Sequence, residues 1–274
     1  KKAIPSRIII PTTSFLLLSA KDGVLSIKST DTNIAFSLKM GAEVFGTGVS
    51  ALCVPADILS GIIGNLASDD VLLELIEFTL KVAAGKAKAT INSLPADDFP
   101  RMPVPKTRIG TLPTQLMASI NRLFAPFVVQ DESSPVLQGV YMVCKDRNLK
   151  IAAADHFRAS YLHQVFDSED FEVNIPARGK SILKECVGDT EMWLAENTGM
   201  VILKTTDGEF ASTLLETNFP TTWTAFERMD GATPSVARVG AGELLGAAKF
   251  VAAMSNNVNH CVSIDVAENV IVVT

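Results

Sequence analysis

The sequence repeats itself at long range, and this internal repeat is the feature that most constrains the fold. The segment 22–31 recurs as 146–155, an offset of 124 residues. A third copy begins late, where residues 269–273 match 148–152 at an offset of 121. A unit of about 122 residues is long enough to bury a core of its own. We therefore expect a tandem of similar domains rather than a solenoid of short repeats.

Proline marks the same two places in the first and second units. Val54-Pro55-Ala56 is followed 44 residues after its proline by Phe99-Pro100. Ile175-Pro176-Ala177 is followed 43 residues after its proline by Phe219-Pro220. A proline in the first helical turn costs no hydrogen bond, so each Pro-Ala pair indicates the start of a helix.

The period also predicts the domain boundaries. It places the start of the first unit before Lys1 and the end of the third unit beyond Thr274. We therefore expect a chain that is incomplete at both ends. The expected domains are 1–106, 107–231 and an incomplete 232–274.

Short apolar segments with a period of two predict antiparallel strands, because turn residues such as Lys21-Asp22-Gly23 join them into hairpins. The expected strands are 15–18, 24–27, 34–38, 71–75, 79–82, 140–143, 149–151, 158–165, 191–195 and 200–204. Helical periodicity predicts helices after Pro55 and Pro176 and over 113–124 and 242–254. Two helices on a largely antiparallel sheet in each unit indicate an α+β fold.

Composition limits the class of protein. Charged residues make up 20% and hydrophobic residues 47%, and no run of about 18 apolar residues could span a membrane. We therefore expect a cytoplasmic protein. The net charge of −6 argues against wrapping nucleic acid over the whole surface, but it leaves room for a basic patch on one face.

The cysteines and histidines predict neither a metal site nor a cofactor. The four cysteines Cys53, Cys144, Cys186 and Cys261 lie far apart and are expected to be reduced core thiols. His163 and His260 have no acidic or cysteine partner at metal-ligand spacing.

An enzyme is the rival class of function. Asp155 stands next to His156, with Ser160 nearby. Adjacent residues on a strand point to opposite faces, so this pair is badly placed to act as orienter and base. Asp31 occupies the position of Asp155 in the other copy. The simpler interpretation is a turn or cap aspartate common to the units.

Three segments in order, on this period, resemble the bacterial-type DNA polymerase III β subunit, the sliding clamp. Residues 94–100 are similar to the acidic Phe-Pro loop that closes the first domain of that family, and 154–159 to its Thr-Asp-Gly-His-Arg-Leu segment. Residues 243–256 are similar to its third-domain helix and the Leu-Ser-Asn that ends it.

The resemblance implies a mechanical rather than a catalytic function. Family members form a head-to-tail dimeric ring whose helices line a central hole. Duplex DNA passes through the hole, and the ring tethers the replicative polymerase and confers processivity. Basic side chains on those helices would attract phosphates without reading bases. The expected channel residues are Arg122, Arg178, Lys180, Lys184 and Lys249. The helix after Pro55 departs from this pattern, since it carries Asp57 and no basic residue through Leu66.

The resemblance also implies a cleft between the second and third domains, where short linear peptides of polymerases, clamp loaders and repair proteins dock. The residues that match it are Leu137, Asp155, His156, Phe157, Arg158 and Pro220. The family's Gly-His-Arg appears here as His-Phe-Arg, and its Tyr-Arg-Arg-Val as Thr222-Trp223-Thr224-Ala225. These departures predict a variant peptide specificity. A clamp-like scaffold that does not encircle DNA remains the alternative.

Overall fold

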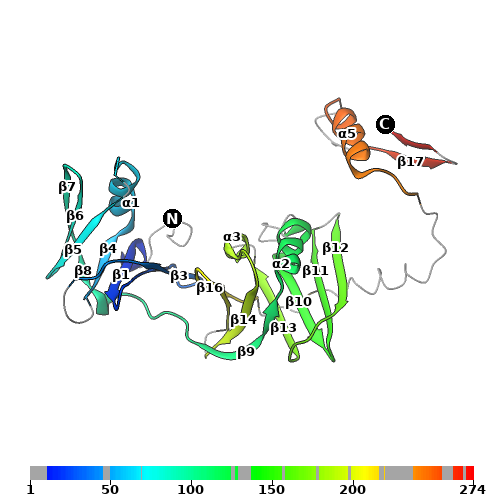
Figure 1. Ribbon diagram of the computed structural model, residues 1–274. Coiled ribbons are helices and arrows are strands. Elements are labelled where there is room, and N and C mark those ends of the chain that lie inside the picture. Colours follow the sequence, from blue (N-terminus) through cyan, green and yellow to red (C-terminus); the bar gives the residue numbers. More distant parts are fainter. Residues whose placement is uncertain are drawn as a thin grey trace. The chain divides into compact units, whose positions relative to one another are not determined.

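The structure is a computed structural model that describes residues 11–45, 50–68, 70–124, 127–128, 137–155, 158–176, 179–196, 199–215, 219, 237–254, 262–267 and 270–274. The chain forms two compact units, residues 1–221 and 222–274. Figure 1 shows the order of the elements along the chain. The predicted boundaries near residues 106 and 231 remain predictions.

The first repeat contains eight strands and one α-helix in its described part. Its elements are η1 (Pro11–Ser14), β1 (Phe15–Lys21), β2 (Val24–Thr30), β3 (Ile34–Gly41), β4 (Ser50–Pro55), α1 (Ala56–Gly64), β5 (Leu72–Ile76), β6 (Thr79–Ala84), β7 (Ala87–Asn92), β8 (Leu94–Pro95) and η2 (Ala96–Asp98).

The second repeat begins with β9, α2 and η3 and follows the order of the first repeat from β10 onward. Its elements are β9 (Pro105–Leu112), α2 (Thr114–Ser119), the π-helical turn η3 (Ile120–Phe124), β10 (Gly139–Lys145), β11 (Asn148–Ala154), β12 (Ala159–Val165), β13 (Phe171–Pro176), α3 (Lys180–Glu185), β14 (Thr190–Ala195), β15 (Met200–Lys204) and β16 (Gly208–Thr213). The second unit contributes α5 (Ala241–Ala252) and the hairpin β17 (Ile264–Ala267) with β18 (Val270–Val273). The predicted mixture of antiparallel hairpins and few helices is confirmed.

The repeated hairpin turn has the same backbone in both copies. Asp22 and Gly23 have φ of 49° and 77°, and Asp146 and Arg147 have φ of 48° and 64°. Two successive residues with positive φ are the requirement of a two-residue hairpin whose twist matches its strands. Asp and Gly tolerate this conformation, whereas an arginine adopts it only under the constraint of the strands on either side.

One nine-stranded sheet runs through both repeats, in the order β8-β4-β1-β2-β3-β16-β15-β14-β9. The two repeats meet where β3 pairs with β16 in antiparallel register, with Phe36 opposite Phe210. The two rings meet edge to face with centroids 5.4 Å apart. The second repeat also contains the four-stranded sheet β12-β11-β10-β13, and the first repeat contains the three-stranded sheet β5-β6-β7.

The largest core lies in the second repeat. Leu116, Met117, Ile120 and Phe124 bury the inner side of α2 and η3 against the strands beneath them. The first repeat has a smaller core, in which α1 buries Leu59 at 7% exposure while Ile58 is 53% and Ile63 40% exposed. Both isoleucines are therefore left largely exposed, although a helix buries its apolar residues when it packs along a whole face.

Helix α2 depends on a cap from a distant loop. The residue before it, Pro113, makes no side-chain cap. Oδ1 of Asp189, which follows α3, accepts the backbone N–H and the hydroxyl of Thr114, both at 2.8 Å. These two hydrogen bonds lower the pKa of Asp189, because they stabilise its charged form. Asp189 therefore connects the loop after α3 to the start of α2.

Candidate DNA-facing and peptide-binding surfaces

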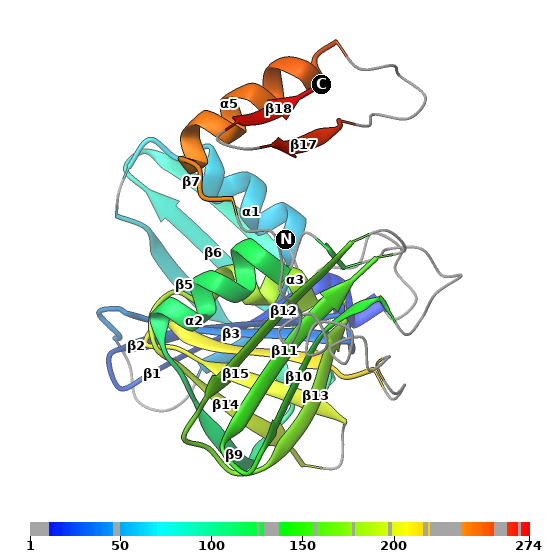
Figure 2. The same ribbon diagram turned by 90° about the vertical axis from the view of Figure 1, so that its right-hand side faces the viewer.

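The helices of the second repeat pack side by side and present cations to solvent. Helix α3 contacts η3, and Nδ2 of Asn121 donates to the carbonyl of Leu183 at 2.7 Å. Figure 2 shows α2 and α3 next to each other above the strands. Ile120 and Leu183 are fully buried beneath them. Packing therefore fixes which side of each helix faces outward.

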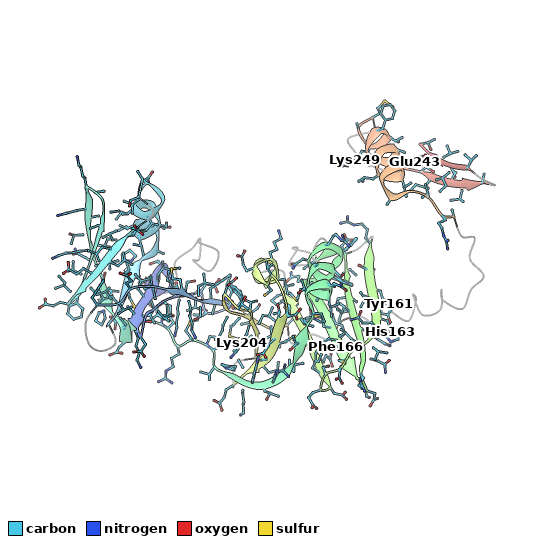
Figure 3. The ribbon with its side chains drawn as sticks, in the orientation of Figure 1. Tyr161, His163, Phe166, Lys204, Glu243 and Lys249 are labelled. Atoms are coloured by element: carbon cyan, nitrogen blue, oxygen red, sulfur yellow. The ribbon has the colours of Figure 1, made fainter. Side chains whose placement is uncertain are left out.

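Two of the predicted channel cations lie on this outward side. The side chains of Arg122 on η3 and Lys184 on α3 are exposed. Lys180 begins α3, but its side chain lies outside the described residues, as does all of Arg178. Lys249 is exposed on α5 of the second unit, and Figure 3 shows it on the same helix as Glu243.

Cations on helices differ from many of those on strands and turns. Seven ion pairs between described side chains join residues of strands, turns or loops. Examples are Lys81 with Glu74 and Lys204 with Glu209. By contrast, no described carboxylate lies within ion-pair distance of Arg122, Lys184 or Lys249. Their charges are therefore available to an external anion.

Helix α1 contributes no cation to this pattern. It carries Asp57 in its first turn and no basic residue. The departure noted in the sequence therefore falls on this helix. Positive charge on the described helices is confined to η3, α3 and α5.

The structure brings two of the predicted cleft residues into contact. Oδ2 of Asp155 accepts from the guanidinium of Arg158 at 2.6 Å and 2.9 Å, and Oδ1 accepts the Arg158 backbone N–H at 2.7 Å. Asp155 follows the last residue of β11 and closes the turn into β12. Asp155 therefore lies in a turn and not on a strand, as the comparison with His156 on opposite faces of a strand had assumed. The conclusion that this carboxylate is a turn residue is confirmed.

An aromatic side chain that the sequence analysis did not select completes this cluster. The guanidinium of Arg158 lies over the ring of Phe127, 5.2 Å from its centroid. Phe127 is itself packed against the core of the second repeat. Arg158 is thus held between a carboxylate and an aromatic face, although its side chain remains 63% exposed. No sequence signal links Phe127 to Arg158, because Phe127 lies between η3 and β10 whereas Arg158 lies just before β12.

The remaining cleft residues are only partly described. Leu137 is half-buried two residues before β10. His156, Phe157 and Pro220 lie outside the described residues. Phe219, next to Pro220, is buried and stacks on Tyr141 with ring centroids 5.1 Å apart. The residue before Pro220 is therefore held by an aromatic stack on β10.

Other kinds of site find no support in the described residues. Within the ranges given above, no three His, Cys, Asp or Glu side chains come together as a possible metal site. The helices described there are also too short or too polar for any of them to cross a membrane.

Known proteins share similarity with most of this chain. Residues 1–103 match the family model for the DNA polymerase III beta subunit, N-terminal domain. The beta sliding clamp of Bacillus subtilis is 26% identical over 234 residues, which cover 81% of this chain and 62% of that protein. The beta sliding clamp of Streptomyces coelicolor is 25% identical over 64% of this chain and 46% of that protein. The chain is thus similar to bacterial beta sliding clamps over most of its length.

Solved clamp structures show the same fold. The DNA polymerase sliding clamp from Bacillus subtilis aligns with a TM-score of 0.82 at 22% identity, covering 99% of this chain and 75% of that one. The beta subunit from Streptococcus pyogenes aligns with a TM-score of 0.84 at 21% identity, covering 100% and 75%. The predicted clamp fold is confirmed. The chain spans about half to two thirds of the length of the two curated clamp relatives named above.

Proposed function

We propose that this protein is a DNA sliding clamp, which encircles duplex DNA without reading its sequence and tethers the replicative polymerase. In this function it is a non-catalytic, cytoplasmic subunit of the polymerase holoenzyme. The observation that carries the proposal is the presence of exposed cations on the packed helices. Arg122, Lys184 and Lys249 are exposed without a described carboxylate partner.

This arrangement suits a sliding contact. Unpaired cations attract the phosphates of DNA whatever its base sequence. Each such contact makes the affinity for DNA depend on salt concentration and does not discriminate between bases. A cation already paired with a carboxylate has less to gain from a phosphate. The overall charge of −6 discourages DNA from binding elsewhere on the surface.

The pairing of β3 with β16 supports a head-to-tail dimer. By the repeat offsets, β3 corresponds to β12 and β16 corresponds to β7. Both β7 and β12 are edge strands of their sheets in the described part of the chain. Tyr161 and His163 lie along β12 in Figure 3. Because an open edge is a ready template for another strand, repeating the β3–β16 contact at these edges would join further domains and a second copy.

The exposed Arg158, held by Asp155 and Phe127, supports a peptide-binding site on the second domain. We propose that short linear peptides of the polymerase, the clamp loader and repair proteins dock there. A Helicobacter pylori beta clamp, at 19% identity and a TM-score of 0.77, has been solved bound to a DNA ligase peptide. A cationic group over an aromatic ring offers a peptide both a charge and an apolar surface.

The deciding experiment is retention on nicked circular DNA at high salt, followed by linearisation. A clamp should stay on circles once loaded and leave when they are cut, because the link is topological. The variant Arg178→Glu, Lys180→Glu, Lys184→Glu should lower retention. A matched control with the same change in charge is Lys21→Glu, Lys145→Glu, Arg147→Glu, whose positions are at hairpin turns. Equal retention of both variants would indicate that the helix cations do not contact the DNA. Release from intact circles would indicate a scaffold that does not encircle DNA.

A further inference from the structure

The segment between the first two repeats runs along the side of the nine-stranded sheet away from the helices (Figure 1), and it lines two hollows there. Met102 packs against a small apolar cluster formed by Ala35, Met200, Ile202 and Ala211. The carbonyl of Val104 then accepts the backbone N–H of Glu196 at 2.9 Å. The segment is thus held by one apolar anchor and one main-chain hydrogen bond, as an extended peptide would be.

The segment, residues 100–105, does not fill the space beside the sheet. A hollow of about 530 Å³ remains on one side, and a smaller one of about 180 Å³ remains on the other. The larger hollow has walls from both repeats. It is lined by Thr30, Thr32, Pro100, Arg101, Met102, Pro103, Val104, Glu196, Met200 and Thr213. Its volume lies within the range of ordinary ligand sites.

The rim of the larger hollow carries a strained residue. Thr32 has φ of 76°, which a β-branched side chain rarely adopts. The surrounding loop holds it there, since the Thr32 backbone N–H donates to Oγ1 of Thr30 at 3.0 Å and that hydroxyl donates to the carbonyl of Ile34 at 2.9 Å. Strain of this kind tends to occur at binding sites, where it fixes the shape of a wall.

The charge of the rim selects the ligand. Arg101 is exposed, and no described carboxylate pairs with it. Glu196, the acidic residue of the lining, forms an ion pair with Lys106 at 3.3 Å. The exposed Arg101 beside an apolar floor fits a peptide that carries an acidic residue beside apolar ones.

We propose that the larger hollow between the first two repeats is a second peptide-binding site, which takes a short extended segment with an apolar anchor flanked by an acidic residue. By the repeat, Thr32 corresponds to His156 and Pro100 to Pro220 of the cleft proposed above. The inference therefore rests in part on that proposed function. A clamp with both sites could hold one partner at each.

The test is a charge swap measured by fluorescence polarisation, with a fluorescein-labelled peptide Gly-Asp-Leu-Pro-Leu-Asp-Gly and a second peptide in which both acidic residues are lysine. Arg101→Glu should weaken the acidic peptide roughly threefold to tenfold and strengthen the lysine peptide, as expected for a partly exposed ion pair that is reversed. Arg147→Glu, a turn arginine with the same change in charge, should alter neither.

Arg158→Ala separates this site from the other cleft. If the acidic peptide weakens with Arg158→Ala and not with Arg101→Glu, the peptide binds in the cleft of the second domain and the second site is overturned. If Arg101→Glu weakens both peptides equally, charge pairing is absent and the site is also overturned. Retention on circular DNA, measured on the same variants, reports separately on the clamp function.

Discussion

The Asp155 carboxylate holds Arg158 at both its backbone and its guanidinium, at 2.7 Å and 2.6 Å. The first repeat has the same turn without the arginine. There Oδ1 of Asp31 accepts the backbone N–H groups of Asn33 at 2.9 Å and Ile34 at 2.7 Å. The aspartate is therefore a structural feature of the repeat, and the arginine is an addition specific to the second domain.

Asp155→Ala should lower the free energy of unfolding by about 1–2 kcal/mol, because it leaves the Arg158 N–H without its side-chain acceptor. Asp155→Asn keeps an acceptor oxygen and should lose less than about 1 kcal/mol, since an ion pair with a largely exposed arginine contributes little. Urea denaturation of both variants measures the difference. Equal losses would show that the charge, rather than the turn hydrogen bond, stabilises this loop.

Arg158→Ala with Leu137→Ala should weaken binding of polymerase-tail peptides by roughly tenfold, a change of about 1.4 kcal/mol. The reason is that Arg158 offers a charge over the Phe127 ring at the edge of the proposed cleft. Fluorescence polarisation with a labelled peptide measures it. Arg108→Ala is a suitable control, because Arg108 pairs with Glu191 on the sheet. Full-strength binding by the double variant would indicate that the peptide binds at another place on the protein.

Thr32→Gly should raise the free energy of unfolding by about 0.5–1 kcal/mol, because glycine adopts φ of 76° without steric cost. The Thr32 backbone N–H keeps its bond to Thr30, so the loop is retained. Chemical denaturation checks the sign. A loss of stability would mean that the threonine side chain contributes more than its backbone conformation costs.

The order of elements could be predicted because turn residues and helix-start residues act over a few positions of the sequence. The turn at Asp22 and Gly23 and its copy at Asp146 and Arg147 both form the predicted hairpins. The helix after Pro55 begins at Ala56 as expected. Each of these depends on residues a few positions apart, where turn and cap chemistry act directly.

Contacts between distant segments could not be predicted in this way. The pairing of β3 with β16 joins edges far apart in the chain, and nothing in either strand identifies its partner. The cap that Asp189 gives to Thr114 and the stacking of Phe127 on Arg158 depend equally on the assembled fold. The channel and cleft residues came from a family resemblance, so their roles stay predictions until they are measured.

Buried thiols should make the protein resistant to alkylation. Burial is the main cause that raises the pKa of Cys53 to about 11 and of Cys186 to about 12, and the nearby Asp98 and Glu185 charges add to it. In a Cys261→Ser variant at pH 8.5, iodoacetamide should react about 100-fold more slowly with native than with urea-unfolded protein, because the thiolate is the reactive form.

The same shift predicts a loss of stability at alkaline pH. Below the ordinary cysteine pKa of about 9, the Cys186 thiol is protonated in both states, so its contribution is fully present. Between about 9 and about 12 the unfolded state loses the proton first, and stability falls as pH rises. Urea midpoints at pH 8 and 10.5, compared with those of Cys186→Ala, isolate this effect. An identical pH dependence in the variant would contradict it.

Gly208→Ala should destabilise the junction between the repeats. A Cβ at Gly208 would lie 2.5 Å from the carbonyl oxygen of Ser37 and 2.7 Å from Cδ2 of Leu38, so the paired strands β3 and β16 must separate. We expect the free energy of unfolding to fall by roughly 1–3 kcal/mol.

Gly61→Ala is the matched control, because a Cβ there meets open space within α1 and should instead stabilise the helix by about 0.5–1 kcal/mol. Since the junction is the only strand pairing between the two described repeats, unfolding of the Gly208 variant should also become less cooperative. A single sharp transition with unchanged midpoint would show that this contact does not couple the domains.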